Sequence, residues 1–225
     1  MNHLALNPGV LEVAAYRKDQ PTLICGLGRS GTTALARCFA VSQNAHLVTT
    51  DTSAGSNLEV REMNEVLARG DADTLRRFRE RTSLEYSPSF VFKNPLFEIH
   101  ARTFPSLITQ WEGANLILMV RDPLCVCLRE DSIFGSSTNH RRLLDTLDMQ
   151  QSSIRNVLSW ADQVGVLMVS YEKLLIDPRR VVAGINHWTT FELLDPEGSA
   201  AAIVHDNPYY LRRQAIALAR LQSAV

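Results

Sequence analysis

The chain has 225 residues, and its 23 Lys and Arg nearly balance its 24 Asp and Glu, for a formal net charge of −1. This length suits one domain with a substantial core, so we expect residues 1–225 to form a single domain. Its core should span about 20–190, followed by a C-terminal helical segment, 190–225. The balanced charge lacks the basic surplus of nucleic-acid-binding proteins, so no nucleic acid partner is expected.

Membrane and secretory signals are also missing from the sequence pattern. No apolar run reaches the length of a membrane-spanning helix, and residues 1–19 lack the charged and apolar segments of a signal peptide. Cys25, Cys38, Cys125 and Cys127 show neither a metal-ligand spacing nor a disulfide framework. They read as buried thiols in a reducing compartment, and we expect a cytoplasmic protein without a membrane span.

Strands and helices alternate along the predicted chain. In order, the pattern predicts strand 22–26, helix 32–42, strand 46–50, loop 51–57, helices within 58–83, strand 89–93, helix 95–105, strand 115–120, helix 123–133, helical region 139–161, strand 164–170, helix 178–188 and a last helix near 209–222. This alternation predicts an α/β fold of three layers, α/β/α, with a central, mainly parallel sheet. Ligands of such sheets bind at the carboxyl ends of the strands.

The turn after the first predicted strand has the composition of an anion-binding loop. A short apolar strand precedes it, and an alanine-rich helical stretch, Thr33 to Val41, follows it. Glycines at positions 26, 28 and 31 can supply positive φ angles and let an anion approach the backbone. Strand, loop and helix in this order direct backbone N–H groups and a helix N-terminus at one point, which suits phosphate or sulfate.

The same segment nearly matches the P-loop pattern. Gly26 and Gly31 have the required spacing and are followed by Thr32 and Thr33, so that Thr32 stands where a P-loop has its lysine. The positive charge comes instead from Arg29, within the loop. The pattern predicts a P-loop-like fold without the lysine of standard ATPases; the alternative is a tight strand-to-helix connection that binds nothing.

The run Arg29-Ser30-Gly31-Thr32-Thr33 resembles the 5′-phosphosulfate loop of sulfotransferases that use 3′-phosphoadenosine 5′-phosphosulfate (PAPS). Members of that family carry Lys or Arg followed by Ser-Gly-Thr-Thr or a close variant. The resemblance implies that the 5′-phosphosulfate is held by Gly28, Arg29, Ser30, Gly31, Thr32 and Thr33.

A second match is the strand at 115–120, which runs directly into Arg121-Asp122-Pro123. In the family this arginine binds the 3′-phosphate, and a guanidinium at a strand end can bind a phosphate through two parallel hydrogen bonds. The alternative is that Arg121 pairs with Asp122 or another carboxylate. Under both interpretations Asp122 is a helix N-cap and Pro123 the first helical residue.

The 3′-phosphate site also contains a departure from the family. Its members usually have a serine eight residues after the arginine, and this chain has Arg129 there, with Ser132 one helical turn later. Either Arg129 replaces the hydroxyl with a charge, or Ser132 reaches the phosphate from the same helix face.

A third match is the predicted strand at 164–170, which ends in Tyr171-Glu172, with Asp177-Pro178 opening a helix. In the family this tyrosine lies near the nucleotide. From its chemistry alone, Tyr171 is equally suited to be a core residue with a hydrogen-bonded hydroxyl.

A fourth match is the run Phe90 to Pro95, which reads as a strand ending in Lys93 before a helix opened by proline. Many sulfotransferases have a lysine motif here. A lysine at the carboxyl edge of the sheet can offset the charge that grows on the leaving group. The alternative is a solvated surface lysine.

The candidate general base is a glutamate after the second predicted strand, because several branches of the family use a glutamate at that place. Glu59 fits that place, with Arg61 two residues later as orienter or substrate clamp, and Glu62 is the fallback. Alternatively, both acids only complement a helix N-terminus. His100 ranks lower, because a helical segment separates it from Lys93.

The four matches occur in the family's order between about residues 22 and 188. The resemblance implies a sulfotransferase that moves the sulfuryl group of PAPS to a hydroxyl or amine of a small-molecule, carbohydrate or peptide acceptor, without a metal. Glu59 would be the base, and Lys93 and Arg29 would offset the developing charge. The alternatives are a P-loop nucleotide kinase that binds ATP with magnesium, and a catalytically inactive nucleotide-binding relative.

Overall fold

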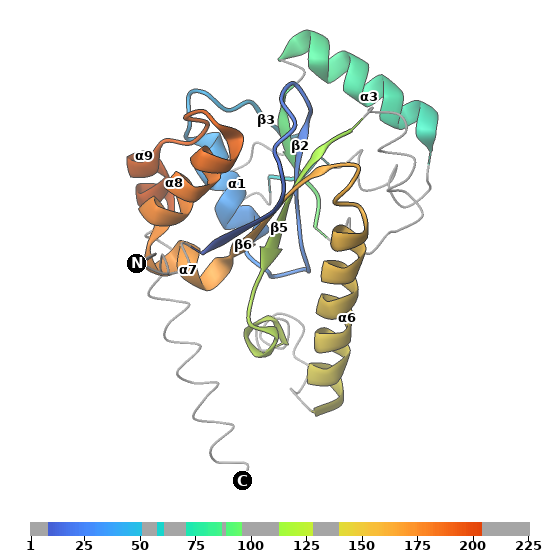
Figure 1. Cartoon of the computed structure of the whole chain (residues 1–225), viewed down its shortest axis with the longest axis vertical. Coiled ribbons are helices and arrows are strands. Elements are labelled where there is room, and N and C mark those ends of the chain that lie inside the picture. Colours follow the sequence, from blue (N-terminus) through green and yellow to red (C-terminus); the bar gives the residue numbers. More distant parts are fainter. Residues whose placement is uncertain are drawn as a thin grey trace, which may run out of the picture.

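The computed structural model describes residues 9–50, 58–60, 71–86, 89–95, 113–127 and 140–203. Six strands within these ranges form one sheet in the order β1-β6-β5-β2-β4-β3 (Figure 1). Their bounds are β1 (Val10–Ala14), β2 (Thr22–Cys25), β3 (Leu47–Val48), β4 (Val91–Lys93), β5 (Asn115–Val120) and β6 (Gly165–Ser170). Neighbouring strands pair in parallel except β1, which pairs antiparallel with β6 at one edge.

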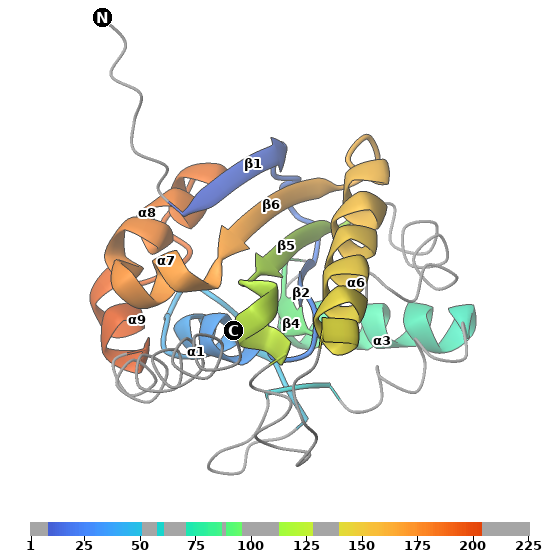
Figure 2. The same cartoon turned by 90° about the horizontal axis from the view of Figure 1, so that it is seen from below.

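Helices cover both faces of this sheet (Figure 2). One face carries α1 (Thr32–Ala40), α7 (Tyr171–Ile176), α8 (Pro178–Thr189) and α9 (Pro196–Ile203); the other carries α3 (Ala72–Glu85) and α6 (His140–Ser159). The predicted three-layer α/β fold with a mainly parallel sheet is therefore confirmed.

Two hydrophobic cores lie on the two faces because successive residues of a strand point to opposite sides. In β2, Ile24 packs in the core beneath α1 and α8, whereas Leu23 and Cys25 pack in the core beneath α3 and α6. Since β2 and β5 are buried on both faces, nearly every residue in them is apolar, which is why the sequence marked them as strands.

Parallel pairing brings the carboxyl ends of β2, β3, β4, β5 and β6 to one edge of the sheet. The anion loop, Arg121 and Tyr171 each follow one of these ends directly, and Lys93 is the last residue of β4. Residues that are far apart in sequence thus meet at one place, as ligand sites of open α/β sheets do.

Most predicted elements agree with the observed ones to within a few residues, and the strand at 115–120 is β5. Residues 123–127 are helical, while the remainder of the helix predicted at 123–133 lies outside the described residues. The predicted helices at 95–105 and near 209–222 also lie outside them, apart from Pro95, which is described as a turn.

Two elements were not predicted, β1 and α7, whereas α9 falls within the helical segment expected at 190–225. β1 is an edge strand that pairs with β6, more than 150 positions later in the sequence. Leu11 within it is exposed. The Trp188 indole donates a 2.9 Å hydrogen bond to the Ala14 carbonyl, which ties α8 to this edge. α7 begins at Tyr171, immediately after β6, with Ser170 as its N-cap.

The turn between β1 and β2 is tied to the start of β5 by a buried asparagine. The Asn115 amide nitrogen donates to the carbonyls of Arg17 at 2.9 Å and Gln20 at 3.2 Å, and its oxygen accepts from the Arg17 amide at 2.8 Å. Asn115 is fully buried, so these bonds satisfy polar groups that would otherwise be costly to bury.

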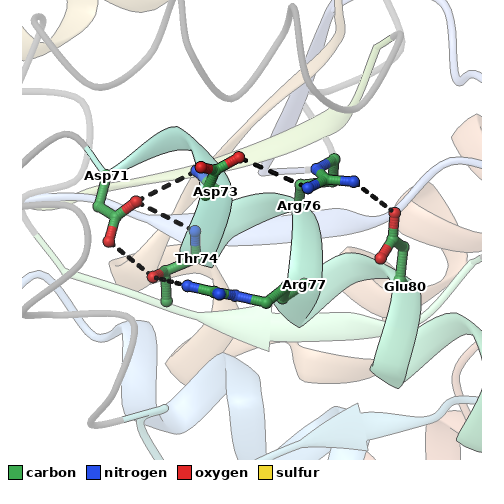
Figure 3. A network of polar contacts seen from close by, with 6 residues as sticks. All are labelled: Asp71, Asp73, Thr74, Arg76, Arg77 and Glu80. Atoms are coloured by element: carbon green, nitrogen blue, oxygen red, sulfur yellow. Dashed lines mark hydrogen bonds and ion pairs between the residues drawn. The ribbon is translucent and has the colours of Figure 1, made fainter.

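The first turn of α3 is held by polar contacts on the surface (Figure 3). The Asp71 carboxylate caps the helix by accepting from the Asp73 and Thr74 amides, both at 3.1 Å, and from the Thr74 hydroxyl at 2.7 Å. The Thr74 hydroxyl bond first and then the amide bonds lower the pKa of Asp71. Arg76 forms ion pairs of 3.5 Å with Asp73 and Glu80 along the exposed side of the helix. These charges form a solvated helix face.

Candidate anion-binding site

The loop between β2 and α1 is shaped by two glycines. Gly26 has φ 143°, and a Cβ there would lie 2.6 Å from the Met119 carbonyl oxygen. Gly31 has φ 96° and is the N-cap of α1, without a side-chain hydrogen bond to the first turn. No acidic residue lies in that turn, so its first amides and the positive end of the helix dipole favour an anion.

The third loop glycine does not have the positive φ predicted for it. The left-handed residue next to it is Arg29, with φ 69°. The expectation for Gly28 was wrong because the loop turns one residue later, where the Ser30 amide bonds to the Leu27 carbonyl at 3.0 Å. Arg29 is therefore held in a conformation that is uncommon for residues with a side chain.

Ser30 is directed into the protein. Its side chain is 2% exposed, and its Oγ has no hydrogen-bond partner within the described part of the chain. It lines a small cavity of about 10 Å³ between the loop, β5 and α6, together with Met119 and Gln150. Its role as a phosphosulfate ligand stays a prediction.

Lys93 lies at the end of β4 and reaches the start of α1. Its Nζ donates to Thr33 Oγ1 at 2.9 Å and lies 3.1 Å from Glu59 Oε1. The side chain is 1% exposed. The alternative of a solvated surface lysine is therefore wrong: a buried ammonium needs partners, and the loop helix and a carboxylate supply them.

Glu59 is anchored beside the end of β3 through its backbone. Its carbonyl accepts hydrogen bonds from the Thr50 amide and from Thr49 Oγ1, both at 3.3 Å. Leu58 before it has φ 55°, a left-handed value that turns the chain at this point. The Glu59 side chain is 23% exposed, so its carboxylate contacts both the buried lysine and solvent.

Burial lowers the pKa of Lys93, because the charged ammonium loses hydration in the protein interior. The Glu59 carboxylate acts in the opposite direction and raises that pKa. The positive charges of Arg29 and Arg37 lower it further. The Lys93 ammonium thus lies in the field of two further cations, which an anion bound beside it would offset.

Arg121 follows β5 and contacts the anion loop. Its Nη1 donates a 2.6 Å hydrogen bond to the carbonyl oxygen of Arg29, and its guanidinium carbon lies 4.8 Å from the centre of the Tyr171 ring.

Asp122 caps the helix that follows, accepting from the amides of Leu124 at 2.8 Å and Cys125 at 3.4 Å. The predicted N-cap is therefore confirmed.

No protein-family model and no curated protein matches the sequence. Solved structures do match it. The sulfotransferase domain of the olefin synthase from Synechococcus PCC 7002 aligns with a TM-score of 0.54 and 17% identity, over 81% of this chain and 78% of that one. The sulfotransferase domain from the curacin biosynthetic pathway aligns with 0.52 and 14%, over 79% and 77%. Sulfotransferase STF9 from Mycobacterium avium aligns with 0.52 and 13%, over 84% and 68%.

The chain shares the P-loop-like α/β fold of these sulfotransferase structures. At these identities the likeness concerns the P-loop-like architecture, which leaves the chemistry to be argued from the side chains of the site. None of the helices in the described ranges is both long and apolar enough to cross a membrane.

The sulfotransferase fold brings most of the predicted site together. Contacts join Lys93, Thr33 and Glu59, and other contacts join Arg121, Arg29 and Tyr171. The candidates Arg129 and Ser132, the fallback Glu62, its neighbour Arg61, and His100 lie outside the described residues.

Two residues near the site had no role predicted from the sequence. Glu172 Oε1 accepts a 3.0 Å hydrogen bond from the Asp122 amide, which links the ends of β5 and β6. Its position directly after Tyr171 was the only signal. Arg37 lies on α1 and affects the pKa of Lys93, and its spacing of one helical turn from Thr33 could have placed it on the same face.

Proposed function

We propose that this protein is a sulfotransferase that moves the sulfuryl group of PAPS to a hydroxyl or amine acceptor and releases 3′,5′-ADP. The observation that carries the proposal is the meeting of Thr33, Lys93 and Glu59 where the anion loop enters α1. The sulfotransferase fold of the chain supports it.

The groups around the loop suit a 5′-phosphosulfate. The first turn of α1 offers amides and contains no acidic residue of its own, and Arg29 supplies an exposed positive charge in the loop. Thr32 and Thr33 follow at the first turn of the helix, as in the phosphate loops of other nucleotide-binding proteins. PAPS supplies an activated sulfuryl group, and these residues would bind and orient it.

Lys93 would neutralise the negative charge that develops on the bridging oxygen as the bond to sulfur breaks. Its lowered pKa makes the ammonium a stronger acid, which suits a group that hydrogen-bonds to a leaving oxygen. Glu59 would accept the proton of the attacking hydroxyl or amine. Its partly exposed carboxylate, 3.1 Å from the lysine, gives the base and the leaving-group cation neighbouring positions.

Arg121 would bind the 3′-phosphate, with Arg129 or Ser132 as its second ligand. The guanidinium has five N–H donors in a planar fork, so a bond from Nη1 to the Arg29 carbonyl is compatible with a phosphate contact. The acceptor class and a cytoplasmic location stay predictions.

Calorimetric titrations of 3′,5′-ADP and of ATP with magnesium test the proposal, on the wild type and on Arg121→Ala. We expect micromolar binding of 3′,5′-ADP, weakened at least tenfold in the variant, and little binding of ATP. Preference for ATP with magnesium would move the protein to the kinase class. Binding of neither would overturn the cofactor assignment.

A further inference from the structure

Two residues follow each of the strands β5 and β6, and the two that follow β5 contact the two that follow β6. The strands pair in parallel up to their last residues, Val120 and Ser170, and the next residues in the two chain segments are Arg121-Asp122 and Tyr171-Glu172. The guanidinium lies over the tyrosine ring at 4.8 Å, and Glu172 Oε1 accepts from the Asp122 amide at 3.0 Å. Residues that directly follow two neighbouring strands therefore contact each other.

The Tyr171 ring also lies against the anion loop. A Cβ placed on Gly31 would overlap ring atoms of Tyr171, so the loop backbone and the ring are in close contact. Tyr171 is 7% exposed and Arg121 8%. One buried ring thus contacts both the loop that opens α1 and the guanidinium that follows β5.

The guanidinium in turn contacts the loop. Arg121 Nη1 donates its 2.6 Å bond to the carbonyl oxygen of Arg29, the loop residue with φ 69°. A left-handed conformation at a residue with a side chain persists where its surroundings fix it. The bond from Arg121 fixes the orientation of this peptide group, and with it the loop amides that follow.

We propose that Arg121 and Tyr171 together couple the two anion sites of a nucleoside bisphosphate. Tyr171 is a positioning residue: its ring sets the plane of the guanidinium and supports the loop at Gly31. Arg121 serves the 3′ side and also holds the 5′ loop through the Arg29 carbonyl. This inference rests on the proposed function for the identity of the ligand, while the packing of ring, guanidinium and loop stands without it.

The coupling is tested with two ligands that differ only in the 3′-phosphate, 3′,5′-ADP and 5′-AMP. Their affinities are measured by calorimetry for the wild type, Arg121→Lys, Tyr171→Leu and Tyr171→Phe. We expect Arg121→Lys and Tyr171→Leu to weaken 3′,5′-ADP about tenfold or more and 5′-AMP severalfold. Tyr171→Phe should recover the affinity lost in Tyr171→Leu, because the aromatic ring rather than the hydroxyl makes the contact.

Loss of affinity for 3′,5′-ADP alone, with 5′-AMP unchanged in every variant, would overturn the coupling. It would mean that Arg121 acts only on the 3′-phosphate. Arg121→Lys retains the charge and a long side chain, so it stays informative if Tyr171→Leu does not fold, and the melting temperature of each variant shows which are folded.

A readout without ligand separates this inference from the proposed function. Amide hydrogen exchange of loop residues 28–33 should be at least tenfold faster in Tyr171→Leu than in the wild type, and near the wild-type rate in Tyr171→Phe. Unchanged exchange would overturn the positioning role even if 3′,5′-ADP binds. Faster exchange in a protein that binds neither nucleotide would overturn the proposed ligand and leave the positioning role in place.

Discussion

Lys93 Nζ lies 3.1 Å from Glu59 Oε1, although 34 positions separate the two residues in the chain. The lysine is 1% exposed and the glutamate side chain 23%. The pair places a buried cation and a partly exposed carboxylate side by side at the entrance to α1. Because their exposures differ, loss of one partner should affect the protein differently from loss of the other.

Replacing Glu59 by glutamine should remove the base and leave the nucleotide site in place. We expect turnover of PAPS with a productive acceptor to fall by a factor of about 10² to 10⁴, the usual contribution of a general base. Affinity for 3′,5′-ADP should not fall by more than about threefold, because the substitution removes a negative charge beside the anion loop and keeps the Lys93 cation. Steady-state kinetics and calorimetry measure the two quantities, and unimpaired turnover would exclude Glu59 as the base.

The effects of substituting Glu59 and Lys93 on the free energy of unfolding should not be additive, because the two side chains form an ion pair. Glu59→Met leaves the Lys93 charge buried without this carboxylate, so it should be strongly destabilising, whereas Lys93→Met leaves a carboxylate that water still reaches. Urea unfolding of both single variants and the double variant should give a coupling energy of about 1–3 kcal/mol. Additive effects of the two substitutions would contradict a direct interaction.

Gly31→Ala should destabilise the protein more than Gly28→Ala. The first substitution places a Cβ in the Tyr171 ring and in a left-handed conformation, at a cost of about 2 kcal/mol or more. Gly28 is the matched control, because its φ is not in the left-handed region. Urea unfolding of the two variants measures the difference, and equal stabilities would contradict the packing of Tyr171 on the loop.

Cys38 should make the stability depend on pH in alkaline solution. Burial raises the pKa of its thiol from 9.0 to about 12. Between these values the unfolded chain loses the thiol proton while the folded chain keeps it, so this contribution is complete below pH 9 and declines as the pH rises. The stability advantage of the wild type over Cys38→Ala should shrink by about 1 kcal/mol between about pH 8.5 and 10.

Denaturant unfolding of the two proteins at a series of pH values provides this measurement. The comparison cancels the titration of other groups, such as Tyr16, whose pKa burial also raises. An advantage that stays constant with pH would show that the thiol ionises as readily in the folded chain as in the unfolded one.

Asn115→Leu should be among the costly substitutions away from the site. It removes three hydrogen bonds and leaves the Arg17 amide and two carbonyls of the β1–β2 turn without this partner. The expected loss is about 2–4 kcal/mol of unfolding free energy. Asn44→Ala, at an asparagine with one exposed hydrogen bond, is the control and should cost less than about 1 kcal/mol.

The helix caps and the strand–turn–helix segment were predicted well because their contacts lie within a few residues of each other. The caps at Asp122 and Asp177, each followed by proline, are contacts within three residues, so the sequence contains all of their parts. The same holds for the strand, glycine turn and helix at 22–40, and for β5, whose burial on both faces demands an apolar run.

Edge pairing and loop conformation were predicted less well. β1 joins the sheet through β6, more than 150 positions later, and a short exposed edge strand leaves a weak apolar pattern. The positive φ lies at Arg29 rather than Gly28, in a loop whose Arg29 carbonyl accepts a hydrogen bond from Arg121, 92 positions later. A glycine permits such a conformation, but its surroundings decide where it occurs.

The sequence by itself therefore determined the layers, the parallel sheet and the positions of the anion loop, Lys93 and Arg121 at strand ends, because periodicity and capping act over a few residues. Only the tertiary structure decided that Lys93 is buried against Glu59 and that Tyr171 packs between Arg121 and Gly31. These contacts depend on the register of neighbouring strands and on which loops return to the same edge. That register is set by the packing of both cores together, which no short segment contains.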